Sequence, residues 1–204
     1  IVPETNRVVQ QYIEAPHLID GFKYSVRFFV VLTCLDPLTV FVHEDGLVKF
    51  TTRPYRSDAG SLDDPFVPLT NPGVLKQDPL APALARINHA DYRRYLRDQR
   101  VDVDWLWHRV RHLIAATFFA GRDAMLAGAR KMGIDCAGCF QLFGLDVLVD
   151  RELKPWLLEC NYGPSLQTEG STTDPSTAME TDLKLRVVGD TLKLAAGGAA
   201  RAES

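Results

Sequence analysis

The sequence predicts an α+β fold with a largely antiparallel sheet flanked by helices. Three observations support this prediction. Strand-like segments joined by short turns fill the first quarter of the chain, two helical segments follow, and a second strand pair precedes a last helix. The chain has 204 residues, of which 46% are hydrophobic and 24% charged, so it can bury one core of ordinary size.

The first strands are expected where β-branched and aromatic residues cluster between turn signals. One segment alternates at first and then becomes wholly apolar, as a buried strand does. Asp36-Pro37 ends that strand, and Glu44-Asp45-Gly46 has the composition of a hairpin turn. We therefore expect a first strand at 7–14, followed by an antiparallel meander of three strands at 23–33, 38–43 and 47–51.

Residues 53–88 are expected to form a loop, because Pro, Asp and Ser are frequent there. A short Arg-rich helix is expected at 91–100, and Asp102 has the position of an N-cap for a second helix. That second helix has an apolar stripe with helical spacing, at Leu106, Val110, Leu113, Ile114, Thr117 and Phe118. The remaining predictions are strands at 140–150 and 155–161, a helix at 177–195 and a disordered tail at 197–204.

Composition and charge exclude several classes of protein. The formal net charge of −3 provides no global attraction to nucleic acid or anionic lipid. No segment approaches the ~20 apolar residues of a membrane span. We therefore expect no nucleic acid and no membrane among the partners.

The cysteines favour a reducing, cytosolic setting. Four cysteines, Cys34, Cys136, Cys139 and Cys160, are too few and too scattered for a disulfide framework. Cys136 and Cys139 have the spacing of half a zinc site, but no second pair completes it, so free thiols are the favoured interpretation.

The most informative segment is FQLFGLDVLVDRELKPWLLECN, residues 140–161. Two strands within it carry acidic or amide side chains between apolar ones. Because side chains alternate along a strand, Glu159 and Asn161 are expected on one face, together with Leu157. Asp146 occupies the first strand of the pair.

A turn sets which of these side chains lie opposite each other. A two-residue turn at Glu152-Leu153 pairs Arg151 with Lys154. Counting outward from that pair places Asp146 directly opposite Glu159. Asn161 then lies one diagonal step away.

Two opposed carboxylates between apolar residues repel each other and lose hydration, unless a cation lies between them. The oxygen ligands of Asp146, Glu159 and Asn161 suit Mg²⁺, which binds through carboxylates and substrate phosphates. The alternative is a solvent-facing polar strand without a function, which we favour for a single acidic residue. For three converging residues we favour the metal.

Several ordered motifs carry a family resemblance. The run LFGLDVLVD…LKPWLLECNYGPSL closely resembles the C-terminal signature of tubulin–tyrosine ligase-like enzymes, which have an ATP-grasp fold. VVQQYIEAPHLIDGFKYSVRFFVV (8–31), EDGLVKFTTRPY (44–55) and PLTN (68–71) fit the same family in order. The resemblance implies an ATP-grasp-like partial domain over residues 1–196, whose N-terminal part is absent.

The resemblance also implies roles for individual residues. The metal ligands would be Asp146, Glu159 and Asn161, which hold the Mg²⁺ that bridges the phosphates of ATP. Lys23 would contact ATP, and Arg27 and Lys49 would hold the amino-acid substrate. The segment Gln10, Gln11, Tyr12 and Ile13 would line the adenine site, and Thr70 and Asn71 would approach the nucleotide.

The chain departs from the family pattern at several positions. Gln11 and Ser25 stand where Lys and Asp are common, and Lys49 replaces an Arg that can grip a carboxylate with two bonds. Pro68 takes the place of a His, and Pro72-Gly73 follows where glutamate-adding members have Tyr-Ser. These departures leave the metal site intact and leave the transferred amino acid open.

The implied reaction is carboxylate–amine ligation driven by ATP, with a free amino acid as co-substrate and an acidic protein tail, of tubulin in particular, as acceptor. The implied location is cytoplasmic, at microtubules or cilia. The alternatives are a non-catalytic binding module, favoured by Ser25 and Lys49, and an ATP-grasp ligase with a non-tubulin acceptor. We expect little turnover from this piece alone.

An arginine-rich segment could steer an acidic tail electrostatically. Residues 86–111 carry seven Arg against four Asp. A solvated mixed-charge helix face is the alternative interpretation of this pattern, and it is the more common one.

Overall fold

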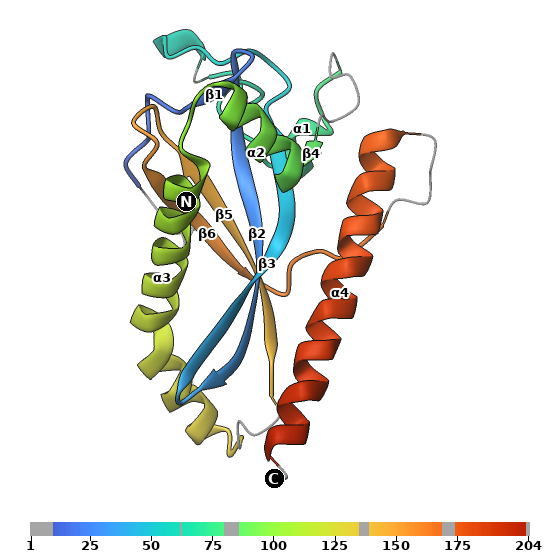
Figure 1. Ribbon diagram of the computed structural model, residues 1–204. Coiled ribbons are helices and arrows are strands. Elements are labelled where there is room, and N and C mark those ends of the chain that lie inside the picture. The colour runs from blue at the N-terminus through green and yellow to red at the C-terminus, as the bar shows by residue number, and fades with distance from the viewer. Residues whose placement is uncertain (1–9, 62, 80–85, 135–138, 169–173, 203–204) are drawn as a thin grey trace.

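The computed structural model describes residues 10–61, 63–79, 86–134, 139–168 and 174–202 (Figure 1). Its strands are β1 (Leu18–Ile19), β2 (Phe22–Leu35), β3 (Leu38–Phe50), β4 (Arg86–Asn88), β5 (Gln141–Val149) and β6 (Pro155–Tyr162). Its helices are α1 (Pro72–Leu75), α2 (His89–Asp98), α3 (Val103–Lys131) and α4 (Pro175–Ala202), with a short 3₁₀ turn at Ala59–Ser61. None of the helices described here is both long and apolar enough to cross a bilayer.

The strands form one antiparallel sheet, in the order β4-β3-β2-β5-β6, with β1 paired to β2. Helices flank this sheet on both sides, with α3 and α4 on opposite faces (Figure 1). The predicted α+β class with an antiparallel sheet is therefore confirmed.

The alternation of side chains along β2 builds two cores. Tyr24, Val26 and Phe28 point to one face, where they join a cluster with α2 and α3. The α3 stripe packs there as predicted, through Leu106, Val110, Ile114 and Phe118, and Asp102 caps the helix by accepting a bond from the Trp105 amide. Phe29 and Val31 point to the other face and pack with Leu183 and Val187 of α4.

The predicted hairpin turn at Glu44-Asp45-Gly46 is wrong. The strand continues through it as one β3, but Phe28 pairs with Gly46 while Val30 pairs with Val42. Three residues of β3 therefore lie against the single Phe29, which makes a bulge. Residues that favour turns also suit a bulge, because in both the backbone departs from the regular hydrogen-bond pattern of paired strands.

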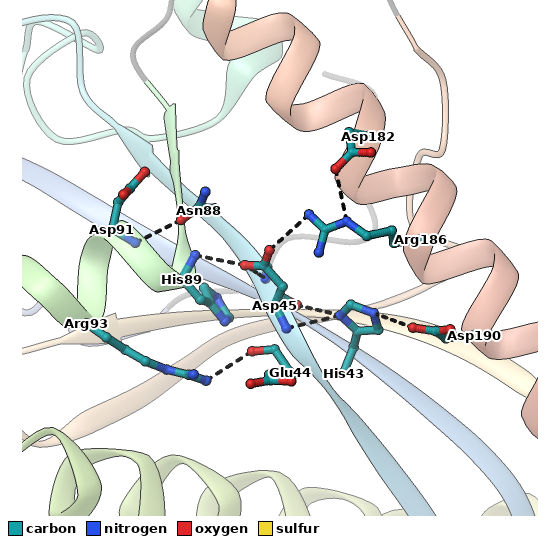
Figure 2. Close-up of polar contacts among 11 residues, drawn as sticks. His43, Glu44, Asp45, Asn88, His89, Asp91, Arg93, Asp182, Arg186 and Asp190 are labelled. Atoms are coloured by element: carbon teal, nitrogen blue, oxygen red, sulfur yellow. Dashed lines mark hydrogen bonds and ion pairs between the residues drawn. The ribbon is translucent and has the colours of Figure 1, made fainter.

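Asp45 connects this bulge to two helices (Figure 2). Its carboxylate accepts hydrogen bonds from the amides of Gly46 and His89, at 2.9 and 3.0 Å. It also accepts a bond from the Arg186 guanidinium of α4 at 3.2 Å. The bulge thereby fixes the start of α2 and one side of α4 against the same strand.

Other boundaries also differ from the predictions. Residues 10–14, expected within a strand, are irregular, and 7–9 lie outside the described residues. The segment 53–88 is not all loop, because α1 and β4 form within it. Helix α4 extends to Ala202, beyond the residue at which we expected it to end. Cys136, half of the candidate zinc pair, lies outside the part of the chain that the structure describes.

His89 is buried beneath the bulge with its ring between aromatic side chains. Its centroid lies 4.7 Å from that of Phe28 and 5.8 Å from that of Trp107. A Cβ at position 46 would lie 2.5 Å from the ring, so Gly46 is required for this packing. Neither ring nitrogen has a hydrogen-bond partner of normal geometry, although the backbone of Glu44 and Arg27 approaches the ring.

Burial lowers the pKa of His89 to about 4, and the nearby Asp45 and the backbone offset this only in part. The unfolded chain binds a proton near pH 6.5, so the stability that depends on neutral His89 is complete above that pH and is lost as the pH falls towards 4. We expect this residue to lower the free energy of unfolding by about 1 kcal/mol between pH 7.5 and pH 5.5. Urea unfolding at both pH values measures the change, and the difference between them should shrink in His89→Phe. An equal difference in both proteins would contradict the prediction.

Candidate functional site

The face of the sheet that packs on α4 has a polar end and an apolar end. On β2, Lys23, Ser25 and Arg27 continue the face that carries Phe29 and Val31. Lys49 of β3 pairs with Ser25, so it lies on the same face. Lys23, Ser25 and Arg27 share one face because side chains alternate along a strand.

Asp146 of β5 lies at the centre of this polar end. It pairs with Arg27 on one side and with Glu159 on the other. Arg27 donates from Nε to Oδ1 at 2.6 Å and from a terminal nitrogen to Oδ2 at 2.8 Å, while Lys49 Nζ donates to Oδ2 at 2.7 Å. The Asp146 carboxylate is thus held by two cations.

The contacts with Arg27 and Lys49 keep the Asp146 carboxylate ionised. Burial would raise the pKa of Asp146, but hydrogen bonds from Arg27 and the charges of Lys49 and Arg27 outweigh it and hold the pKa at about 2. We expected a metal to offset the repulsion between the opposed carboxylates, whereas the structure shows that Arg27 and Lys49 already neutralise Asp146.

Gly144 provides the space for the Arg27 side chain. A Cβ at this position would lie 3.0 Å from a guanidinium nitrogen of Arg27 and 2.8 Å from Cβ of Pro164. A larger residue would therefore displace the arginine from Asp146. Sequence reasoning missed this role, although a glycine inside a strand is a known sign of close approach.

The Asp146–Glu159 pairing is confirmed, but by a different route from the one predicted. Next to the turn, Val149 of β5 pairs with Pro155 of β6. The turn begins at Asp150, before the predicted Glu152, because the Asp150 carboxylate accepts hydrogen bonds from the Lys154 amide and the Trp156 indole. That register is one residue short of the predicted one.

A bulge in β6 then restores the predicted register between the two strands. Val147 pairs with Leu157 and Asp146 pairs with Glu159, so Leu158 is an extra residue in the ladder. The expectation that Glu159 shares a face with Leu157 is wrong, since the bulge changes the alternation between them. Asn161 pairs with Gly144, one step along the same face as Asp146.

Glu159 and Asn161 lie side by side, with the Asn161 amide donating to Glu159 Oε1 at 2.9 Å. This hydrogen bond holds the two side chains next to each other. Among the described residues, no group of three or more His, Cys, Asp or Glu could hold a metal. A set of two carboxylates and an amide nevertheless fits Mg²⁺, which takes its other ligands from water and phosphate. The three residues present therefore fit the ion.

Lys23 is a buried amine, with 6% of its surface exposed. Its Nζ donates to the Tyr12 hydroxyl at 3.1 Å and lies 4.5 Å from the centroid of that ring. Tyr55 lies on another side, at 5.7 Å. Burial lowers the pKa of Lys23 to about 8, so a bound anion would favour its charged form.

The loop after β3 forms another wall of the site. Thr70 hydrogen-bonds the Ser25 hydroxyl at 2.8 Å, so Ser25 connects strand and loop. Asn71 caps α1, accepting a bond from the Gly73 amide at 2.8 Å. The side chain of Asn71 is thus engaged in a local structural role.

The structure brings all but one of the predicted site residues to a single cavity of about 410 Å³. Asn161 lines a neighbouring cavity of about 390 Å³, which shares Arg27 and Lys49 with the first. The residues at the first cavity are Gln10, Gln11, Tyr12, Ile13, Lys23, Arg27, Lys49, Thr70, Asn71, Asp146 and Glu159.

Sequence reasoning missed the residue that fixes this loop. Arg53 donates to Asp64 at 2.6 Å and to Asp78 at 3.1 Å, and its guanidinium lies 5.0 Å from the Phe66 ring. Asp64 and Asp78 flank the segment that carries Thr70. Charged residues in a loop gave no sequence signal for this, because the contacts depend on how the loop folds.

Replacing Arg53 by Gln is expected to loosen the loop around Thr70. Amide hydrogen exchange across residues 63–79 should accelerate by about fivefold or more, since local opening loses its main ionic restraint. Arg56→Gln is the matched control, because Arg56 contacts only the exposed Asp58 at 3.9 Å among the ion pairs described. Equal exchange in the two variants would contradict the role of Arg53.

The arginine-rich segment lies mostly on the other face of the sheet. Tyr92 and Leu96 anchor α2 in the core shared with α3, away from the two cavities. Arg93 packs on Trp107 at 4.7 Å, and Arg109 packs on Trp105 at 4.6 Å. Much of this charge therefore has intramolecular partners.

Comparison with known proteins adds a family match. A family model described as "Tubulin-tyrosine ligase family" matches residues 1–196. The chain is 34% identical over 182 residues to tubulin polyglutamylase TTLL13 of Mus musculus, covering 83% of this chain and 22% of that protein. It is 36% identical over 172 residues to tubulin polyglutamylase TTLL5 of Homo sapiens, covering 80% and 13%. For tubulin polyglutamylase TTLL6 of Homo sapiens the identity is 33% over 184 residues, covering 83% and 20%. The chain thus spans about a fifth or less of the length of these relatives.

Proposed function

The chain belongs to the tubulin-tyrosine ligase family, and we propose that residues 1–196 form the C-terminal part of an ATP- and Mg²⁺-dependent ligase domain. The main support is the cavity in which Lys23, Arg27 and Lys49 surround the opposed carboxylates Asp146 and Glu159. Such a set of fixed cations and oxygen ligands suits a nucleoside triphosphate, because transfer of its phosphoryl group depends on positioning and charge neutralisation.

Each residue has a role in this proposal. Lys23 binds the phosphates of ATP. The metal ligands are Asp146, Glu159 and Asn161, and Mg²⁺ bound there would neutralise phosphate charge. Gln10 to Ile13 cover the adenine, and Thr70 and Asn71 of the loop after β3 line the same cavity.

Arg27 and Lys49 hold Asp146 in place and orient the substrate carboxylate, because they line both cavities. A carboxylate attacks the γ-phosphorus of ATP, and ADP leaves as an acyl phosphate forms. The amine of the amino acid then attacks the acyl carbon, inorganic phosphate leaves, and the amine loses a proton as the amide bond forms. The side chains of this chain bind and align the two reactants.

The names of the relatives suggest the substrates. They are called tubulin polyglutamylases, so we propose an acidic protein tail as acceptor, with tubulin first among candidates, and free glutamate as the added amino acid. The corresponding location is the cytoplasm, at microtubules.

A second candidate is a non-catalytic binding module. Ser25 favours it, because its hydroxyl bonds Thr70 where an acidic residue is usual in the family. Lys49 favours it less, since it still reaches Asp146 at 2.7 Å.

Mass spectrometry distinguishes the two functions. The full-length protein is incubated with Mg·ATP, mixed amino acids and candidate acceptors that include tubulin. The ligase predicts an ATP-dependent increase in acceptor mass by whole amino-acid residues. Binding of acidic tails without any increase in mass would overturn the ligase and favour the module.

A further inference from the structure

The second cavity, of about 390 Å³, lies between the sheet and α4 and extends the site away from Glu159. Arg27 and Lys49 line it at the end shared with the first cavity. Arg86 of β4 lies further along the same face, because it pairs with Lys49. Residues of the segment after β6 and the first turns of α4 complete the wall.

Positive charge predominates among the described residues that line this cavity. Such a wall favours a ligand that bears a carboxylate over a neutral or cationic ligand. The charged side chains are Arg27, Lys49, Lys76, Arg86 and Lys184, with Glu180 as the carboxylate among them.

Glu180 of α4 is held at both oxygens. Arg86 donates to Oε2 in a very short contact, and Lys184 Nζ lies 2.8 Å from Oε1. Lys184 also donates to the carbonyl of Gln167, in the segment after β6. The two cations are therefore positioned from different elements to grip one carboxylate.

A purely structural connection between β4 and α4 is the simpler explanation. However, the three side chains line a cavity and retain 12%, 15% and 10% exposure, for Arg86, Glu180 and Lys184. The cavity also continues directly to Arg27 and Lys49. A ligand carboxylate that entered from there would meet the same two cations.

We propose that Arg86 and Lys184 form a carboxylate-binding subsite, which Glu180 occupies in this structure and which a carboxylate of the acidic substrate takes over. The statement that this carboxylate belongs to a ligase substrate rests on the proposed function. The existence of the carboxylate-binding subsite does not. The carboxylate belongs either to the incoming free amino acid or to the acceptor tail.

The test measures binding to the full-length protein without ATP or magnesium. The probes are free L-glutamate and a fluorescent oligoglutamate peptide. Glu180→Gln removes the competing charge, so it should tighten binding of one probe by about fivefold. Arg86→Gln should weaken binding of the same probe by about tenfold. An effect on the peptide assigns the subsite to the acceptor, and an effect on glutamate assigns it to the amino acid.

Asp182→Asn is the matched control, because Asp182 is exposed on the same helix and pairs only with Arg186 among the ion pairs described. It should leave the affinities unchanged. Circular dichroism verifies that each variant is folded, and Lys184→Gln provides a second route if Arg86→Gln does not fold. Unchanged or weaker binding of both probes in folded Glu180→Gln would overturn the subsite. A wild type that binds as predicted but never ligates would instead count against the proposed function alone.

Discussion

Replacing Glu159 by Gln in the full-length protein is expected to lower the rate of amino-acid ligation by about 100-fold or more. The substitution keeps the size of the side chain and removes a charged oxygen ligand from the set that would hold Mg²⁺. Even residues that only support a metal ligand change activity by about 10- to 100-fold, so a ligand should cost at least as much. Incorporation of a labelled amino acid into the acceptor tail measures the effect.

The same hairpin offers the control for this substitution. Glu152 is exposed in the turn between β5 and β6, so Glu152→Gln removes an equal charge from the same hairpin without touching the cavity. Its activity should match that of the wild type. Raising the magnesium concentration should recover part of the Glu159→Gln activity. Undiminished ligation in Glu159→Gln would reject the assignment of this residue.

Replacing Asp146 by Asn should lower the free energy of unfolding by about 3–5 kcal/mol, because it leaves two buried cations without their common partner. The side chains involved are only 7% exposed for Asp146, 17% for Arg27 and 11% for Lys49, so water can compensate little. Urea unfolding of the 204-residue chain, followed by tryptophan fluorescence, measures the loss.

An exposed ion pair of similar length is the comparison. Arg122 lies 2.7 Å from Asp36, whose side chain is 68% exposed. Asp36→Asn should cost less than about 1 kcal/mol, as exposed pairs do. Similar losses in the two variants would show that Asp146 is not the centre of a buried charge network.

Several elements were predictable because their signal is local. The wholly apolar run of β2 indicated a strand covered on both faces, and the stripe from Leu106 to Phe118 indicated one buried side of α3. The placement of Asp146 and Glu159 on two neighbouring antiparallel strands was also predictable, whereas their direct pairing results from two register shifts that cancel. Strand and helix periods act over a few residues, so they can be counted along the chain.

The errors occurred where the surroundings of a segment decide its conformation. Glu44-Asp45-Gly46 has turn composition, yet it forms a bulge because Asp45 finds partners in α2 and α4. The segment from Gln10 to Ile13 has strand composition, yet it lines a cavity as irregular chain. Both outcomes depend on neighbours that are distant in the sequence.

The sequence by itself determined the antiparallel strands, the buried face of α3 and the placement of Asp146, Glu159 and Asn161 on two neighbouring strands. Only the tertiary structure decided that Arg27 and Lys49 hold Asp146, that Arg53 fixes the loop of Thr70 and that Glu180 lies between Arg86 and Lys184. The physical reason is that side-chain alternation is a property of one strand, whereas an ion pair requires two segments to meet. The pairing of Asp146 with Glu159 depends on both kinds of information. The turn that begins at Asp150 shifts the register by one residue, and the extra residue Leu158 shifts it back, so the pairing agrees with a prediction that was counted from a different turn.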